Sequence, residues 1–291
     1  MLRLGVRAWR RGGVAVAIVG VWFAALPLAG GAAASTMALV PHRAIYDLTL
    51  ARAEPSTSMV AAAGRLVFEI NGSACEGYSV DFRNVTRVTD RDGVARVTDM
   101  RSTTRETISP PTLDFDHQTF VEGTLATEVA GLAEAKASGV SVEVRKPKET
   151  SHSLARAIFP TAHTRLILDA AAEGERILEA SVYDGGDEAS TVYETATVIG
   201  PRETGLPGAS DAEKAALAEV PGVMEMGAWR LVISYFQAGG ADGERSPEYE
   251  LTFTLLENGI SYDVSFNYGA FTLAGDLTEL NLGTMRACAP Q

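Results

Sequence analysis

Apolar and polar residues alternate with a period of two along much of this 291-residue chain. Near its end, threonines separate Leu251, Phe253 and Leu255, and the alternation resumes after Glu257-Asn258-Gly259. Alternation on both sides of an Asn-Gly pair is typical of a β-hairpin whose strands bury one face. The same pattern predicts strands at 43–52, 66–70, 78–83, 94–108, 112–121, 140–146, 177–184, 190–199, 228–237, 251–255, 262–268 and 271–282.

This number of strands indicates a mainly β fold. A single antiparallel sheet that curls towards closure is the simplest arrangement, because closure hides edges that would otherwise pair with other chains. The strand at 66–70 is predicted to end at an Asn71-Gly72 turn, because this pair has the composition of a hairpin turn. No segment has the length or composition of an interdomain linker, so we expect one domain.

Helical patterns are few. Residues 161–173 carry an apolar stripe and are followed by Gly174, a natural helix stop. The spacing Ser210-x-x-Glu213 is that of a capping box and predicts a short second helix. The alanine-rich segment 126–137 is predicted as a third helix. The stretch 200–222, rich in Gly, Pro and Ala, is predicted to cross the surface as an insertion.

The first 34 residues have the features of a cleavable secretory signal. Four arginines precede an apolar run at 14–28, and Ala32-Ala33-Ala34 follows it. A membrane anchor is the alternative, but the run is shorter than the roughly 20 residues that span a bilayer. Arg10-Arg11 suggests a twin-arginine signal, but Gly12-Gly13 follow where that pathway prefers a bulky apolar pair, so this alternative is disfavoured. We expect cleavage to leave an exported domain, 35–291, with no stable membrane insertion.

Loss of this segment makes the chain more acidic. Removal of four arginines and no acidic residue lowers Lys+Arg from 25 to 21 against 37 Asp+Glu, so the net charge changes from −12 to −16. Such a charge disfavours binding to nucleic acid or to anionic lipid headgroups. The only short basic stretch, 145–148, is interpreted as a solvated turn.

The chain has two cysteines, Cys75 and Cys288. In an oxidising compartment, two thiols without metal-ligand spacing favour one structural disulfide. Two free, buried thiols are the alternative. A bond across this separation would stabilise the fold by at most about 5 kcal/mol in the chain-entropy treatment.

The sequence offers no clear catalytic, cofactor or metal site. None of the four histidines lies in a metal-binding motif, and there is no nucleophile elbow or phosphate-binding loop. Asp114 and Asp116 share one strand face with His117 beside them, which could form an acid/base pair. A solvated strand face explains these residues with nothing added and is the preferred interpretation. His163 is interpreted as a partly buried histidine at a helix start.

Several blocks in order resemble the envelope integrity protein B family, periplasmic proteins of alphaproteobacteria. They cover nearly all of residues 35–291, including Cys75 and Cys288, which match the pair of cysteines of the family. The blocks that carry the resemblance are 159–164, 170–175, 183–185, 229–236, 247–250, 257–259 and 267–271.

The resemblance implies a spiral-like, incompletely closed β-barrel with a few short helices on one side, broadly like the periplasmic lipoprotein carriers. It also implies a Cys75–Cys288 disulfide, a role in keeping the cell envelope intact, and no enzymatic activity. The family's molecular partner does not follow from the sequence.

Three functions are therefore considered. The chain could bind another envelope protein, it could carry a lipid or an acyl chain, or it could be a hydrolase that uses scattered carboxylates. The strand 228–237 bears on the second, because Trp229, Leu231, Ile233 and Tyr235 share one face while Val232 and Phe236 make the other face apolar. Such a strand either borders a ligand cavity or lies between a sheet and a covering helix.

Overall fold

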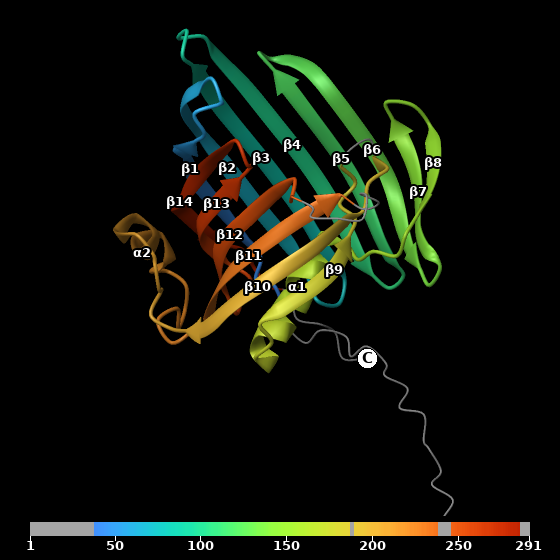
Figure 1. The fold of residues 1–291 in the computed structure, drawn as a ribbon. Coiled ribbons are helices and arrows are strands. Elements are labelled where there is room, and N and C mark those ends of the chain that lie inside the picture. Colours follow the sequence, from blue (N-terminus) through green and yellow to red (C-terminus); the bar gives the residue numbers. More distant parts are fainter. Residues whose placement is uncertain (1–37, 187–188, 238–245, 286–291) are drawn as a thin grey trace, which may run out of the picture. The chain divides into compact units, whose positions relative to one another are not determined.

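The computed structural model describes residues 38–186, 189–237 and 246–285, and they form one fourteen-stranded antiparallel sheet (Figure 1). The predicted signal at 1–34 lies outside the described residues, as does Cys288. The strands are β1 (His42–Ala53), β2 (Met59–Ser73), β3 (Gly77–Asp90), β4 (Ala95–Ile108), β5 (Pro111–Val121), β6 (Thr124–Lys136), β7 (Gly139–Lys146), β8 (Thr150–Leu154), β9 (Ile177–Val182), β10 (Tyr193–Glu203), β11 (Ala228–Gln237), β12 (Tyr249–Leu256), β13 (Ser261–Asn267) and β14 (Phe271–Leu282).

The first and last strands of the chain, β1 and β14, lie side by side in the sheet. β1 pairs with β2 on one side and with β14 on the other, and His42 is opposite Leu282. From β1 the sheet continues through consecutive strands to β8, and from β14 it continues back to β9. β8 and β9 are the two edges and do not pair with each other, so the predicted curled and incompletely closed antiparallel sheet is confirmed.

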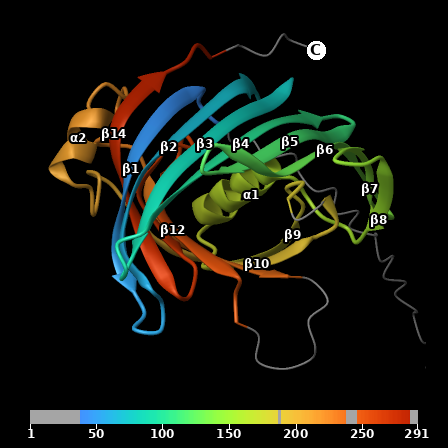
Figure 2. The ribbon, with the colours of Figure 1, turned by 90° about the horizontal axis from the view of Figure 1, so that it is seen from above.

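Two helices accompany the sheet. α1 (Pro160–Glu173) lies inside the curl, with strands β3–β6 on one side and β9–β12 on the other (Figure 2). It begins with proline at its first turn and ends at Gly174, whose φ of 86° lies in the left-handed region. α2 (Asp211–Leu217) packs on β14 and has the predicted capping box between Ser210 and Glu213.

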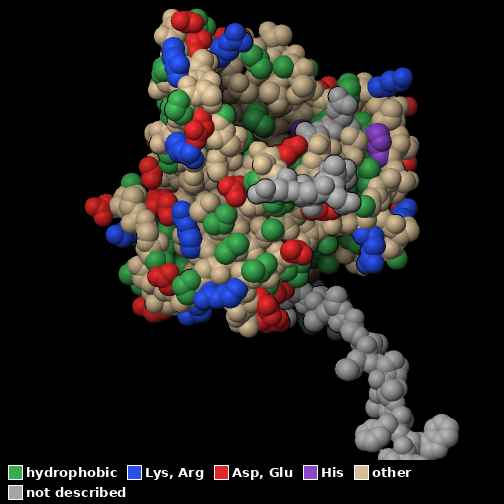
Figure 3. Space-filling model, in the orientation of Figure 1, with side chains coloured by type: hydrophobic (Ala, Val, Ile, Leu, Met, Phe, Trp, Pro, Cys, Tyr) green, Lys and Arg blue, Asp and Glu red, His purple; other side chains and the backbone are tan. Residues whose placement is uncertain are grey.

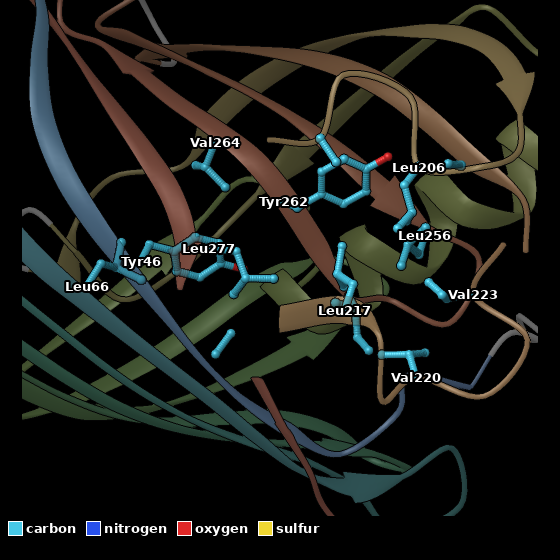
Figure 4. Packing of buried hydrophobic residues seen from close by; sticks show 14 of the residues in the cluster. Tyr46, Leu66, Leu206, Leu217, Val220, Val223, Leu256, Tyr262, Val264 and Leu277 are labelled. Atoms are coloured by element: carbon cyan, nitrogen blue, oxygen red, sulfur yellow. The ribbon is translucent and has the colours of Figure 1, made fainter. Parts of the chain in front are cut away.

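The interior contains three groups of buried apolar side chains. One lies between α1 and strands β2, β3 and β10–β12, and a second lies where β5–β7 meet the segment after β9. The third brings the loops around α2 against β1, β13 and β14 (Figure 4). Leu206, Leu217 and Val220 belong to this third group, so the prediction that 200–222 only crosses the surface is wrong.

The prediction of a helix at 126–137 is also wrong, because this segment is β6. It pairs with β5 and β7, and Ala133 is fully buried on the sheet interior. Phe115 lies beside Gly131, where an added Cβ would come within 2.6 Å of the ring. Small residues are needed here to admit that ring, and this tertiary requirement outweighs the helix propensity of alanine.

The two Asn-Gly pairs behave differently. Asn258-Gly259 forms the predicted turn between β12 and β13, with φ of 88° at the glycine. Gly72, in contrast, remains in β2 opposite Tyr78, and the turn comes later, around Cys75. An added Cβ at Gly72 would lie 2.2 Å from the carbonyl oxygen of Gly77, so this glycine permits close strand approach rather than a turn.

Candidate functional site

The inner faces of β11 and β12 form an apolar surface beneath α1. Ile233 lies opposite Leu251 and Tyr235 opposite Tyr249 in the ladder, so all four side chains share this face. Ile167 of α1 packs in the same group of buried residues. Strand 228–237 therefore lies under a covering helix, one of the two arrangements that its apolar faces predict.

A cavity of about 180 Å³ remains between α1 and these strands. Its wall is apolar where Ile167, Ile233 and Leu255 meet, and it is polar around Asp184 and the tyrosines. The described residues that line it are Pro160, His163, Thr164, Ile167, Val182, Asp184, Tyr193, Ile233, Tyr235, Tyr249, Leu251, Phe253 and Leu255. The other arrangement, a strand bordering a cavity, is therefore present as well.

Three tyrosines form the polar end of the cavity. The rings of Tyr235 and Tyr249 stack with centroids 4.4 Å apart, and the ring of Tyr193 meets both edge-on at 6.1 and 6.3 Å. Burial raises the pKa of Tyr235 and of Tyr249 well above the ordinary value. The negative charge of Asp184 raises both pKa values further, so its field reaches this group of rings.

The apolar surface extends beyond the cavity along the concave side of the sheet. Phe253 and Leu251 continue towards Phe266 of β13, and all three side chains are only half-buried. Phe68 and Phe82, paired across β2 and β3, are half-buried as well. Figure 3 shows that this side of the molecule is hollowed, with hydrophobic side chains around the hollow.

A carboxylate from the sheet holds the start of α1. Phe159 at the N-cap provides no side-chain bond, and Glu106 of β4 accepts hydrogen bonds from the backbone N–H groups of Thr161 and Ala162 at 2.8 and 2.9 Å. Burial raises the pKa of Glu106, while these hydrogen bonds and the charge of Arg165 oppose the increase. Glu106 therefore fixes the helix that roofs the cavity.

The sequence analysis did not single out Glu106. A signal was nevertheless present, because an acidic residue stands at an inward-facing position of the strand 94–108. Its partners lie 55 and 56 positions away, so the sequence pattern could not identify them.

The structure separates the predicted acid/base candidates. Asp114 pairs with Arg145 on the outer face of the sheet, with oxygen and nitrogen 2.7 Å apart, and the Asp116 carboxylate lies 3.9 Å from the Lys146 amine. His117 points the other way, and its Nε2 lies 3.0 Å from the carbonyl oxygen of Asp184. Two exposed ion pairs therefore explain these aspartates, and the geometry does not bring them together with the imidazole.

His163 is more buried than predicted. It lies in the first turn of α1, is 4% exposed and lines the cavity, with Nε2 3.3 Å from the hydroxyl oxygen of Thr195. Burial lowers its pKa to about 4, so the imidazole is neutral at pH 7. It contributes a polar group but no charge to the cavity.

Cys75 lies in the turn between β2 and β3. Because Cys288 is outside the described residues, the Cys75–Cys288 bond stays a prediction. The described residues contain no group of three or more His, Cys, Asp or Glu side chains arranged to hold a metal ion. Neither helix in the described part of the chain is long and apolar enough to cross a membrane.

Comparisons with known proteins agree with this architecture. The chain is 36% identical over 253 residues to the cell envelope integrity protein EipB of Brucella abortus (strain 2308), a match that covers 86% of each protein. It is also similar to the crystal structure of a beta-barrel-like protein of domain of unknown function DUF1849 from Brucella abortus, with a TM-score of 0.78 and 35% identity. That match covers 85% of this chain and 100% of the other. The model of the EipB-like family matches residues 33–283, and the chain therefore belongs to the EipB-like family.

Proposed function

We propose that this chain is a non-enzymatic periplasmic protein that supports the integrity of the cell envelope by binding another envelope protein. The observation that carries the proposal is its 36% identity, over 86% of its length, to a protein named for cell envelope integrity. The amino-terminal sequence supports the compartment, since residues 1–34 have the pattern of a secretory signal.

Deletion of the gene in its native host tests the proposed role. The deletion strain should grow normally in rich medium and poorly in the presence of a membrane-perturbing detergent. The full chain should restore growth, whereas the chain that begins at residue 35 should not, because it would stay in the cytoplasm. Equal restoration by both forms would contradict the periplasmic location.

The strands β4 and β5 carry exposed apolar side chains on which a protein partner could dock. Met100 and Val121 are both more than a third exposed, and they share one face of the sheet because Val121 is opposite Thr98 in the ladder. Apolar side chains that gather on a surface are a common mark of an interaction site. A photo-reactive amino acid at Met100 or Val121 should crosslink one defined envelope protein in living cells, and the same amino acid at Ile177, exposed on β9, should not.

Non-enzymatic action is the part of the proposal that a single variant can test. Asp114 is the residue on which the hydrolase hypothesis depends, and its carboxylate is engaged by Arg145. Asp114→Ala should therefore restore detergent resistance as well as the wild type does. If this variant folds but does not restore resistance, the hydrolase hypothesis gains support.

A second candidate function is the carriage of a lipid or acyl chain, and the cavity beneath α1 favours it. Apolar cavities with a few polar groups at one end are typical of sites for small amphiphilic ligands. Native mass spectrometry of protein purified from the periplasm should show a co-purifying lipid. Leu251→Trp would fill the cavity and should remove the lipid, whereas Val198→Trp on the exposed side of β10 should leave it bound.

A further inference from the structure

We propose that the inward face of β3, β4 and β5 receives an uncharged polypeptide segment of the envelope protein to which this chain binds. The inference rests on the proposed function and adds to it the docking face and the chemistry of the partner. It follows from the separation of charged and uncharged side chains between the two faces of these strands.

The even-numbered positions of β4 point into the curl, because Glu106 reaches α1 from this face. Side chains alternate between the two faces along a strand, so Met100 also points inward. The ladders place Asn84 of β3 and Thr119 of β5 beside Met100 on the same face. In three rows across the strands, the side chains of this face are Phe82, Ser102 and His117, then Asn84, Met100 and Thr119, then Thr86, Thr98 and Val121.

None of these inward side chains is an Asp, Glu, Lys or Arg. The outer face of the same strands carries Asp81, Arg83, Asp99, Arg101 and Asp116. An oxygen of Asp99 lies 2.9 Å from Nη2 of Arg83 and 2.7 Å from Nη2 of Arg101. Hydrogen bonds from these two arginines lower the pKa of Asp99 to about 2. The outer face is therefore a hydrated surface with its own ion pairs, and the inward face has a different chemistry.

The inward side chains are neither packed as a core nor fully exposed. Asn84, Thr98, Ser102 and Thr119 are half-buried, and Met100 is 46% exposed. Depletion of charged residues, with methionine and aromatic side chains present, is characteristic of the central part of protein interfaces. The flexible side chain of methionine also adapts to the shape of a partner. The composition of this face therefore fits a surface that another polypeptide covers.

A charged group docked on this face would lose its water without gaining an opposite charge from the wall, which is strongly unfavourable. Glu106, further along the same face of β4, is 6% exposed and accepts hydrogen bonds from α1, so it offers no charge to a partner here. Arg96 lies at the exposed start of β4, outside the three rows. The wall therefore favours a segment without charged side chains.

Polar and apolar groups are interspersed on this face, which favours a polypeptide over an alkyl chain. Met100 lies between Asn84 and Thr119, and Ser102 lies beside Phe82. An alkyl chain would remove water from the hydroxyl and amide groups without replacing their hydrogen bonds. A polypeptide brings apolar side chains together with backbone donors and acceptors. The three rows span roughly 13 Å along the strands, which matches about four extended residues.

Photo-crosslinking in the native host tests the docking face. A photo-reactive amino acid at Met100 or at Thr119 should crosslink the same protein, and peptide mapping should place both crosslinks in one segment without charged residues. At Thr103 and Gln118, neighbouring positions on the outer face, the yield should be less than about a tenth of that value.

Crosslinks from the outer positions alone would overturn the inference and leave the proposed binding of an envelope protein standing. A product that gains the mass of a lipid or a sugar chain, in place of a protein, would overturn the polypeptide assignment. Failure of all four positions to crosslink would also overturn the inference, and the detergent test of the deletion strain would then decide the envelope role by itself.

Charge substitutions at one position test the chemistry of the segment. Thr119→Lys and Thr119→Glu should each lower the crosslinking yield from Met100 by at least about tenfold, because either charge would be buried without a partner. Thr119→Val should keep the yield within about twofold, since it adds no charge. Gln118→Lys and Gln118→Glu are the matched controls on the outer face and should leave the yield unchanged.

If one charge at Thr119 lowers the yield and the opposite charge raises it, the segment is charged and the inference is wrong. Unchanged yields in both charged variants would overturn it as well. Thermal melts identify any variant that fails to fold, and the comparison of inward with outward positions in the otherwise unchanged chain decides independently of these variants.

Discussion

The carboxylate of Glu106 accepts a hydrogen bond from the backbone N–H of Thr161 at 2.8 Å and thereby caps α1 with a residue from β4. The first N–H groups of a helix have no partner within the helix, and Phe159 offers none from its side chain. A carboxylate here also complements the positive end of the helix dipole. The contact therefore fixes the start of α1 against strand β4 of the sheet.

Glu106→Gln should lower the free energy of unfolding by about 1 to 3 kcal/mol, because an amide replaces a charged acceptor and turns a donor towards backbone N–H groups. Urea denaturation at pH 7 measures this loss. Glu179→Gln, at an exposed position of β9, is the matched control and should change stability by less than about 0.5 kcal/mol. A similar loss in both variants would contradict the capping role.

The neutral, buried His163 should make the fold sensitive to acid. Its pKa is lowered from 6.5 to about 4, so the unfolded chain binds a proton more readily than the folded one as pH falls below about 6.5. The stability that the neutral His163 contributes is fully present above about pH 6.5 and is lost as the pH falls towards 4. Between pH 7 and pH 5 the wild type should lose about 2 kcal/mol more than His163→Gln.

Urea denaturation at the two pH values measures this difference. The matched control is His152→Gln, whose half-buried position on β8 is remote from α1. It should retain the acid sensitivity of the wild type. If His163→Gln also retains that sensitivity, His163 is not its source.

Cys75→Ser should lower the free energy of unfolding by about 2 to 5 kcal/mol if the predicted bond to Cys288 forms. A reductant should lower the thermal midpoint of the wild type in the same way, because it opens the same bond. The double variant Cys75→Ser/Cys288→Ser should melt at one temperature with and without reductant. A wild type that melts at the same temperature in both conditions argues for two free thiols.

Gly131→Ala should destabilise the fold by about 1 to 3 kcal/mol, because the added methyl group would overlap Phe115 and the carbonyl oxygen of Glu143. Leu132→Ala is the matched control, since Leu132 is the next residue of β6 and is exposed on the other face. It should cost less than about 0.5 kcal/mol. Thermal unfolding of both variants checks whether β6 lies against Phe115.

The strands were predictable because most of them bury one face. Where that condition holds, as in β11 and β12, the alternation of side chains gives the strand and its inward face directly. β8 was not predicted, because it is short and polar. β6 was predicted as a helix, because the contact that requires small residues comes from Phe115 on another strand.

Less of the candidate site could be predicted from the sequence. The pattern identified strand 228–237 as a border of a cavity or a helix contact, and both descriptions hold. It could not identify the cavity itself, which depends on the space that Ile167 leaves above Ile233 and Leu251. Asp184 reaches this space from the segment after β9 and Tyr249 from β12, and only the folded arrangement brings these distant parts of the chain together.

The two edges of the sheet, β8 and β9, give it a property that a closed barrel lacks. A closed barrel has a circumference fixed by the number of its strands and the stagger of their hydrogen bonds. Here no ladder joins β8 to β9, and the β9 edge meets only an isolated bridge between Val182 and Ile158, so the curl can tighten or relax without breaking the ladders between its strands. α1, which lies inside the curl and is fastened by Glu106, acts as a spacer, and the size of its side chains sets the radius of the interior.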